Sequence, residues 1–309
     1  MNAFYSMKEI TILSGKGGTG KTSVTAAFAS IAQNTIFCDG DVDAPDLHLI
    51  LHPVIRETHS FPGGWKASID PVMCTGCGLC MDYCRFDAIH QDSSGRYYIN
   101  PVQCEGCRLC ERICPAEAIA SERGMNNFWF VSDTRFGKLV HARMQAGEEN
   151  SGKLVTTVRT HARELANNAG SRFIITDGPP GIGCPAIASV TGTGAVVMIM
   201  EPTRSGLHDA RRLAELVKGF NIPIFAIINK YDMNEEVAAE ITSWLLTEHI
   251  PLLGKLPFNE SVVKAMIENK SITEFDPGSE LSQNLKKSWD TLVEVLENKD
   301  NPDRKNSVL

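Results

Sequence analysis

A glycine-rich loop near the start of the chain constrains the fold more than any other feature of the sequence. The residues SGKGGTGKT occupy positions 14–22, between a short apolar strand expected at 10–13 and a helix of small residues expected at 23–32. In this context the spacing G-x4-G-K-T is typical of a phosphate-binding loop, because glycines let backbone N–H groups converge on phosphate oxygens. Lys21 is expected to meet the β- and γ-phosphates, and Thr22 is expected to ligate Mg²⁺. The residues expected to contact the nucleotide here are Gly15, Lys16, Gly17, Gly18, Thr19, Gly20, Lys21 and Thr22.

Further apolar strands alternate with helical segments downstream. Strands are expected at 36–38, 173–176, 195–200 and 224–228, and helices at 206–220 and 235–248. This alternation predicts an α/β fold with a doubly wound parallel sheet, whose ligand binds at the carboxyl ends of the strands. Ser151 is expected to cap a helix that continues through Ala166.

Eight of the ten cysteines fall between Cys74 and Cys114, in two copies of one unit. Sliding the sequence by 30 residues superposes IDPV at 69–72 on INPV at 99–102, and it superposes the two cysteine runs. Dense cysteines in a chain without an export signal indicate metal ligation, because cytosolic thiols stay reduced. Each run reads C-x2-C-x2-C-x3-C, first as Cys74, Cys77, Cys80 and Cys84, then as Cys104, Cys107, Cys110 and Cys114.

This spacing favours two [4Fe–4S] clusters over zinc. Zinc sites use two C-x2-C pairs with a long spacer, whereas a tight run of four places three thiolates on one cluster and the fourth on its neighbour. The expected ligation is therefore crossed. One cluster would use Cys74, Cys77, Cys80 and Cys114, and the other would use Cys104, Cys107, Cys110 and Cys84.

The stretch from about 66 to 123 resembles a bacterial-type two-cluster ferredoxin, which implies a small α+β domain. In one place it departs from that pattern: Cys114 is followed by Pro115, but Cys84 is followed by Arg85. A cation favours the more negative, reduced cluster, so we expect the cluster that includes Cys84 to have the higher potential.

The phosphate-binding loop carries a second lysine, Lys16, directly after its first glycine. The residues KGGTGKT resemble the deviant loop of the MinD, Mrp and nitrogenase iron protein superfamily, in which this lysine reaches across a dimer to the partner's nucleotide. The resemblance implies an ATPase that works as a homodimer, or as a heterodimer with a paralogous ATPase. It makes Lys16, Lys21, Asp41 and Asp177 the expected catalytic residues.

Two acidic loops match the switches of this superfamily. The first, DGD at 39–41, follows the strand expected at 36–38; the resemblance assigns Asp41 to orienting the attacking water and Asp39 to supporting the Mg²⁺ shell. The second, DGPPG at 177–181, would use Asp177 to bind Mg²⁺ through water and the Gly181 N–H to sense the γ-phosphate. A plain acidic loop is the alternative interpretation at 39–43, since loops commonly carry Asp.

The segment NKYD at 229–232 leaves two interpretations of the base open. N-K-x-D is the guanine-binding motif of GTPases, whereas the resembled superfamily uses an Asn at this position to hold adenine. Because Lys16 is diagnostic of the adenine users, we favour ATP, with Asn229 on the base. Pro257 and Phe258 lie in a segment that closes over the base in that superfamily.

Composition limits the partners and the location. Lys and Arg number 30 against 37 acidic residues, giving a net charge of −7, so the chain has no basic field for nucleic acid. The longest apolar runs, such as 195–200, are far shorter than the ~20 residues that a membrane span needs, and no signal segment is seen at the N-terminus. We therefore expect a cytoplasmic protein without stable membrane insertion.

The sequence predicts three parts: a discontinuous ATPase core at 1–65 and 124–300, an inserted ferredoxin domain at 66–123, and a flexible tail at 301–309. The expected function couples ATP hydrolysis to electron transfer through two [4Fe–4S] clusters, toward an unidentified redox or cluster-accepting protein. The alternatives are an assembly or carrier ATPase for clusters or metal cofactors, and a MinD-like spatial regulator with redox-sensing clusters. Of the remaining cysteines, Cys38 is expected in the core, and burial is favoured over cluster ligation for Cys184.

Overall fold

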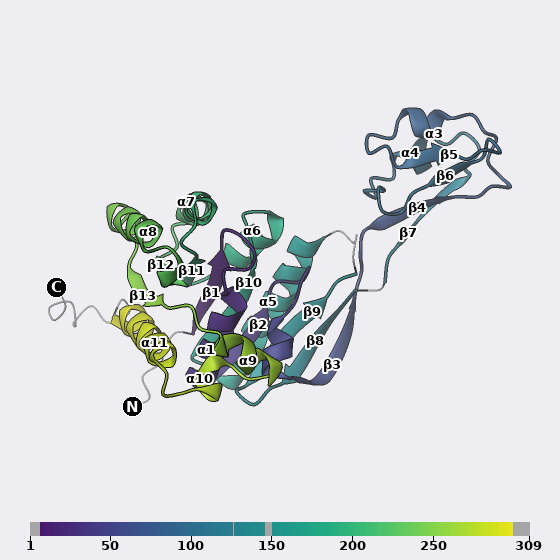
Figure 1. The fold of residues 1–309 in the computed structure, drawn as a ribbon. Coiled ribbons are helices and arrows are strands. Elements are labelled where there is room, and N and C mark those ends of the chain that lie inside the picture. Colours follow the sequence, from purple (N-terminus) through teal and green to yellow (C-terminus); the bar gives the residue numbers. More distant parts are fainter. Residues whose placement is uncertain (1–6, 126, 146–149, 299–309) are drawn as a thin grey trace. The chain divides into compact units, whose positions relative to one another are not determined.

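A nine-stranded sheet organises the larger part of the chain (Figure 1). The computed structural model describes residues 7–125, 127–145 and 150–298; the predicted tail at 301–309 lies outside them. Two compact units are distinguished. The first comprises Met1–Thr58, Trp129–Ala142 and Gly152–Leu309, and the second comprises His59–Phe128 and Arg143–Ser151, which contains the expected insert at 66–123.

The strand order of the sheet is β13-β12-β11-β1-β10-β2-β9-β8-β3. Every pairing from β13 to β9 is parallel, as the alternation of strands and helices predicts. Thus the carboxyl ends of β1, β2 and β10 meet at one edge. The strands are β1 (Lys8–Ser14), β2 (Thr35–Asp39), β3 (Val54–Phe61), β8 (Asn127–Asp133), β9 (Lys138–Arg143), β10 (Phe173–Pro180), β11 (Ala195–Met200), β12 (Ile224–Asn229) and β13 (Leu252–Leu256).

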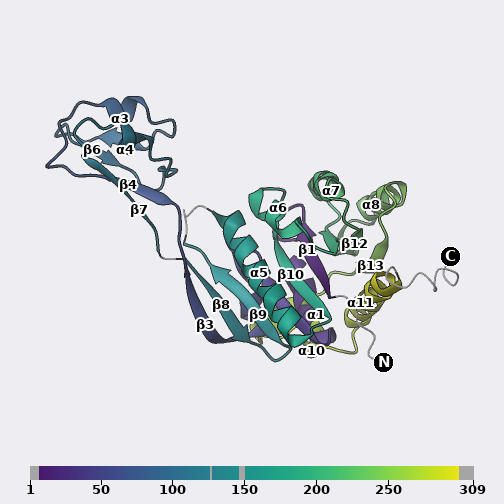
Figure 2. The ribbon, with the colours of Figure 1, turned by 180° about the vertical axis from the view of Figure 1, so that it is seen from behind.

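Helices cover both faces of this sheet. On one face, Phe28 of α1 and Trp289 of α11 pack together over alternate residues of β1 and β10, with ring centroids 5.3 Å apart. On the other face, α7 and α8 cover β11 and β12, and Figure 2 shows α5 and α6 in front of the sheet. The helices are α1 (Lys21–Ile31), α2 (Leu47–Leu51), α5 (Ser151–Ala169), α6 (Cys184–Val190), α7 (Arg204–Lys218), α8 (Glu235–Thr247), α9 (Ser261–Ile267), α10 (Ile272–Phe275) and α11 (Glu280–Asn298).

Two local features differ from the sequence analysis. Ser151 is the first residue of α5 rather than its cap, and the helix continues to Ala169 instead of ending at Ala166. The strand β3 was not expected, because most of its side chains are exposed and it lacks the apolar alternation that marks a half-buried strand.

The second unit is built on two short antiparallel ribbons. The strand β4 (Trp65–Ile69) pairs with β7 (Ile119–Arg123), and β5 (Ile89–Gln91) pairs with β6 (Tyr97–Ile99). Each cysteine run includes one short helix. This helix is α3 (Leu79–Asp82) in the first run and α4 (Leu109–Ile113) in the second. The two halves therefore repeat in structure as they do in sequence.

Candidate functional site: a phosphate-binding loop and two cysteine-lined pockets

The glycine-rich loop connects β1 to α1 in a conformation that requires glycine. Gly18 and Gly20 have positive φ angles, 77° and 89°, which non-glycine residues rarely adopt. Gly20 is further constrained by space, since a Cβ there would lie 2.3 Å from Nδ2 of Asn229. The same Asn229 amide donates a hydrogen bond to the carbonyl of Thr19 at 2.8 Å, so β12 supports the loop directly.

Lys21 lies between two of the predicted acidic residues. Its Nζ is 3.1 Å from Oδ1 of Asp177 and 3.5 Å from Oδ2 of Asp41. Burial alone would lower the pKa of Lys21, but the carboxylates of Asp177 and Asp41 outweigh burial and raise that pKa. The structure therefore brings Lys21, Asp41 and Asp177 together at the carboxyl edge of the sheet.

Two threonines of α1 hold the Asp177 carboxylate. Thr22 Oγ1 donates to Oδ2 of Asp177 at 2.7 Å, and Thr25 Oγ1 donates to Oδ1 at 2.7 Å. Thr25 was missed from the sequence because it lies one helical turn beyond the motif, although its spacing of three from Thr22 places it on the same helix face.

Asp39 is fully buried and organises the first acidic loop. Its carboxylate accepts the N–H of Asp41 at 3.1 Å and that of Leu47 at 3.3 Å. Burial, and next the charge of Asp177, raise the pKa of Asp39 well above its usual value; burial also raises the pKa of Asp41. The ammonium group of Lys21 is the cation that the structure places beside the carboxylates of Asp41 and Asp177.

The donor set fits Mg²⁺ and a phosphate chain. Oxygen donors from Thr22, Asp39, Asp41 and Asp177 are the hard ligands and water acceptors that Mg²⁺ prefers. Of the buried polar atoms of the loop, Thr19 Oγ1 makes no hydrogen bond to any described residue, whereas Lys21 Nζ is ion-paired with Asp177 and Asp41. Since buried polar groups normally have partners, the Thr19 hydroxyl is consistent with a group reserved for a phosphate oxygen.

The second lysine of the loop, Lys16, contacts residues that follow β11 rather than Asp41 or Asp177. Lys16 Nζ lies 3.1 Å from Oε2 of Glu201 and donates to Oγ1 of Thr203 at 3.0 Å. Lys230 approaches Oε1 of the same Glu201 at 3.0 Å and donates to the carbonyl of Gly18 at 3.2 Å. Glu201 is thus shared by two lysines, and it was not singled out in the sequence because it belongs to no motif.

Gly181 connects the second acidic loop to the phosphate-binding loop. Its N–H donates to the carbonyl of Ser14 at 2.9 Å, and its φ is 84°. The N–H that is expected to sense the γ-phosphate therefore has a backbone partner here, one residue before Gly15.

A cavity of about 250 Å³ adjoins the loop at the position expected for the base. It is lined by Gly18, Gly20, Asn229, Pro257 and Phe258, together with apolar side chains of α9 and α11. Asp232 is not among the lining residues; its Oδ1 instead accepts the N–H of Phe258 at 2.7 Å. In the guanine-binding motif N-K-x-D, the aspartate contacts the base. Here that aspartate, Asp232, instead holds the backbone of Phe258 beside the cavity, and this arrangement favours adenine.

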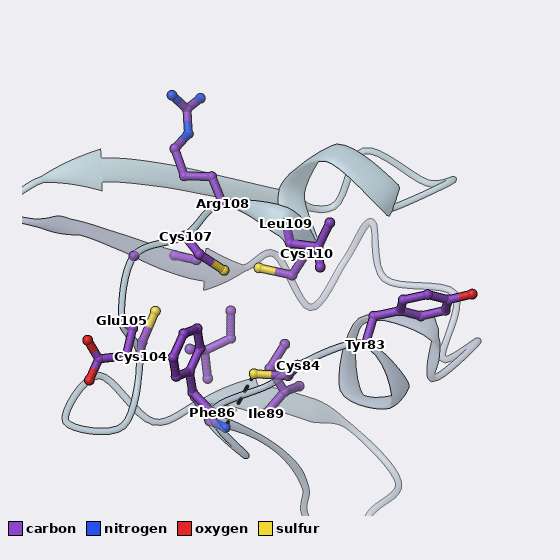
Figure 3. A pocket seen from close by; sticks show the side chains of 14 residues that line it. Tyr83, Cys84, Phe86, Ile89, Cys104, Glu105, Cys107, Arg108, Leu109 and Cys110 are labelled. Atoms are coloured by element: carbon purple, nitrogen blue, oxygen red, sulfur yellow. Dashed lines mark hydrogen bonds between the residues drawn. The ribbon is translucent and has the colours of Figure 1, made fainter.

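The eight clustered cysteines line two separate pockets. Figure 3 shows the sulfurs of Cys84, Cys104, Cys107 and Cys110 turned toward one space. The Cys104 pocket is lined by these four cysteines, and the Cys74 pocket is lined by Cys74, Cys77, Cys80 and Cys114. This is the crossed grouping that the spacing predicts, with one cysteine exchanged between the runs.

The surroundings of the thiols are apolar and supply N–H donors to sulfur. Cys84 Sγ accepts the N–H of Ala88 at 3.4 Å, and Cys114 Sγ accepts the N–H of Ala118 at 3.3 Å. Burial, with nearby thiols adding to it, raises the pKa of Cys110 to about 11. Such thiols ionise readily only when a metal group is present to hold them.

A single metal ion does not suit these pockets. Within 7–125, 127–145 and 150–298, no three His, Cys, Asp or Glu side chains are grouped so that they could hold one ion. Each pocket is lined by four cysteines, the number of thiolates by which a protein holds an iron–sulfur cluster.

The two remaining cysteines occupy different environments. Cys38 is buried in β2, where burial raises the pKa of its thiol. Cys184 is exposed at the start of α6, so the predicted burial of this residue is wrong. It follows the second acidic loop and sits at a helix end, where proline and glycine neighbours keep it at the surface.

Comparison with known proteins gives the family. The CobQ/CobB/MinD/ParA nucleotide binding domain matches residues 10–272. The uncharacterized protein MJ0578 of Methanocaldococcus jannaschii is 32% identical over 299 residues, covering 93% of this chain and 97% of the relative.

Solved structures agree with this match at the level of the fold. The septum site-determining protein MinD of Pyrococcus horikoshii, solved with Mg-ADP, superposes with a TM-score of 0.59 at 19% identity, covering 95% of this chain and 99% of that one. MinD in the MinC:MinD cell division complex of Aquifex aeolicus superposes with a TM-score of 0.53 at 17% identity, covering 93% and 96%. No helix among the described residues is long and apolar enough to cross a membrane. The chain therefore belongs to the CobQ/CobB/MinD/ParA nucleotide-binding family, and within that family it is a P-loop ATPase.

Proposed function

We propose that this protein is a MinD-like, ATP-driven switch whose inserted unit carries two [4Fe–4S] clusters. The observation that carries the proposal is the Asp177 carboxylate, which is held by Thr22, Thr25 and Lys21 at once. A carboxylate at the start of the second acidic loop that bonds to the nucleotide-binding helix must rearrange when Mg²⁺ and a γ-phosphate arrive. Such rearrangements convert hydrolysis into movement.

The residues of the edge take separate roles in hydrolysis. Lys21 and the N–H groups of the loop bind the phosphates, and Thr22 and Asp177 hold Mg²⁺, which neutralises charge on the transferred group. Asp41 orients the attacking water, since its carboxylate lies beside Lys21 and is only partly buried. Asn229 and Phe258 hold adenine in the adjoining cavity.

We infer that a second subunit, either an identical copy or a paralogous ATPase, completes the site. Lys16 contacts Glu201 and Thr203, and we infer that it exchanges these partners for the nucleotide of the second subunit. The solved Aquifex relative was captured with MinC, and a corresponding protein partner is proposed for this chain.

The clusters rest on the two cysteine-lined pockets. All eight thiols belong to one pocket or the other, each pocket holds four, and N–H groups point at sulfur in both. Clusters with full protein ligation supply one-electron redox chemistry and are retained rather than passed on. This supports redox sensing more than cluster carriage.

Electron transfer is the second candidate, and the paired pockets favour it because two adjacent clusters form a path for electrons. The comparisons nevertheless agree better with the MinD-like interpretation, since the family match and the solved relatives concern nucleotide-driven ATPases. In this proposal the nucleotide-driven switch is the primary function, and electron delivery to a redox partner is its output.

Contacts within the nucleotide-binding unit join the helix that follows the second acidic loop, α6, to α5. The second acidic loop leads directly into α6, and a Cβ on Gly152 of α5 would lie only 3.2 Å from the carbonyl of Cys184. Arg159 of α5 also donates to the carbonyls of Ala188 and Thr191 on α6, the latter at 3.0 Å, and is paired with buried Glu9.

Anaerobic reconstitution followed by nucleotide assays tests the proposal. We expect two clusters per chain by iron content and spectroscopy, Mg-dependent ATP hydrolysis, and an ATP-dependent dimer that Asp41→Ala traps and Lys16→Ala cannot form. Mass measurement in solution with ADP or ATP gives the dimer. Absence of iron would remove the cluster assignment, whereas a monomer in every nucleotide state would remove the switch.

A further inference from the structure

The two ends of the expected insert at 66–123 meet at one residue pair. Trp65 begins β4, Arg123 ends β7, and the two are directly opposite in the antiparallel register. The glycines outside them are also joined, with Gly63 N–H donating to the carbonyl of Gly124 at 2.7 Å. We refer to Trp65 and Arg123 as the junction pair, because they close the outer end of the ribbon that carries both cysteine runs.

Trp65 of the junction pair contacts the second cysteine run. The guanidinium of Arg108, between Cys107 and Cys110, stacks on the Trp65 ring at 4.2 Å, and that of Arg123 lies at 4.9 Å from the same ring. Gly106 packs against the backbone of Trp65 so closely that a Cβ there would lie 2.3 Å from its carbonyl oxygen. Trp65 is thereby fixed to the loop that forms the Cys104 pocket.

The next residue of β4 adds a further bond to the same loop. Lys66 Nζ donates to the carbonyl of Cys104 at 3.0 Å, and Ala67 lines the Cys104 pocket. The Cys74 pocket is instead lined by Ile69 and Ile119 at the far end of the ribbon. Four residue steps separate Trp65 from Ile69, which is about 13 Å along a strand.

Arg108 marks a place where the two halves of the repeat diverge. Its counterpart in the first half is Gly78, and both residues have positive φ, 61° and 77°. Arginine is unfavourable in this conformation, and it is retained through its stacking on Trp65 and its ion pair with Glu111 at 2.8 Å. Gly78 instead faces the side chain of Tyr97, since a Cβ at Gly78 would lie 2.9 Å from the Tyr97 hydroxyl oxygen.

We propose that Trp65, clamped between Arg108 and Arg123, couples the Cys104 loop to the nucleotide state, so that the cluster in the Cys104 pocket responds to ATP while that in the Cys74 pocket does not. This rests on the proposed function, and in particular on the clusters. A shift of the junction pair moves the Cys104 loop. This changes the solvent exposure of the cluster and the N–H groups directed at its sulfurs, and both factors set the reduction potential of an iron–sulfur cluster. Trp65 and Arg108 are positioning residues in this scheme.

Redox titration followed by electron paramagnetic resonance tests the inference on the reconstituted full chain, with Mg-ADP and with a non-hydrolysable ATP analogue. Cys77→Ser and Cys107→Ser assign each signal to its pocket. In the wild type we expect the midpoint potential of the cluster in the Cys104 pocket to differ between the two nucleotides by about 59 mV, which is a tenfold change in the ratio of reduced to oxidised cluster for one electron. The midpoint potential of the cluster in the Cys74 pocket should be the same with both nucleotides.

Arg108→Gly should abolish that difference, and the variant should fold because the repeat itself has glycine at this position. Trp65→Leu should act in the same way, while Arg112→Gln, which removes an exposed charge from the same helix, should leave the response intact. Equal responses of both clusters, or a response retained in both Arg108→Gly and Trp65→Leu, would overturn the inference. Intact clusters with no nucleotide response would overturn it too, leaving the cluster assignment in place; a chain without iron would overturn both.

Discussion

Lys16 lies 3.1 Å from Glu201 within its own subunit, and this contact gives the first prediction. If Lys16 acts on the nucleotide of a partner, Lys16→Ala should leave ADP binding intact and lower the turnover of ATP by about 100-fold or more, the usual cost of losing one donor to a transition state. Calorimetry with ADP and phosphate-release assays measure the two effects. Thr203→Ser, which keeps a hydroxyl both as the neutral partner of Lys16 and as the N-cap of α7, is the matched control; loss of ADP binding in Lys16→Ala would contradict the assignment.

The base preference follows from Asn229 and Asp232. Because Asp232 holds the N–H of Phe258 rather than lining the cavity, Asp232→Ala should weaken ATP binding without improving GTP binding. Asn229→Ala should weaken ATP binding further, since the amide also supports the loop through Thr19. Competition of each nucleotide against a fluorescent ADP measures the preference, and a GTP-selective wild type would reverse the interpretation.

The crossed grouping of cysteines predicts which substitutions share a phenotype. Cys84→Ala, although it lies in the first run, should remove the same cluster as Cys107→Ala; Cys114→Ala should remove the same cluster as Cys77→Ala. Iron content and spin-resonance spectra of the four variants separate the two classes. Pairing of Cys84 with Cys77 instead would show that each run binds its own cluster.

Stability should fall in mild acid because of His141. Its ring is buried beside His48 and bonded to Ser132 at 2.8 Å; burial, with His48 adding to it, lowers its pKa to about 4. The unfolded chain therefore takes up a proton near pH 6.5 that the folded chain refuses until about pH 4, so stability is lost as the pH falls through this window. Between pH 7 and pH 5 this one residue should cost about 2 kcal/mol.

Denaturant unfolding at the two pH values measures that loss. His141→Phe should have a flatter dependence than the wild type, whereas His208→Gln, which changes an exposed histidine, should match the wild type. An identical pH dependence in His141→Phe would show that the loss arises elsewhere.

Much of the core was predictable from sequence because its signals are local. The strands at β1, β10, β11 and β12 are apolar runs that end in motif residues, so their type and their sheet edge follow together. The strand β3 could not be predicted in this way, since Val54 and Ile55 are exposed and the strand is defined by its place beside β8. Its formation depends on pairing with distant sequence.

The candidate site likewise contains residues that local motifs predict and residues that only long-range contacts identify. Lys21, Asp41 and Asp177 come together as the motifs predict, but Thr25 and Glu201 act through contacts across 152 and 185 positions of sequence that no motif marks. The Cys104 pocket is another case: Arg85 was expected to influence its cluster, yet Arg108 lines the pocket and Arg85 does not. The sequence shows Arg108 at the position of Gly78 in the repeat, but the contact of Arg108 with Trp65 joins distant residues and no motif marks it.

The single junction of the inserted unit has a consequence for how such a chain arises. Gly63 and Gly124 are hydrogen-bonded neighbours. The two ends of the segment between them are therefore separated by about one strand spacing, near 5 Å. A tight turn could close that gap and join β3 to β8 as a plain hairpin. Ancestral genes could therefore acquire, exchange or discard the cysteine-bearing cassette in one recombination event without redrawing the sheet that binds nucleotide.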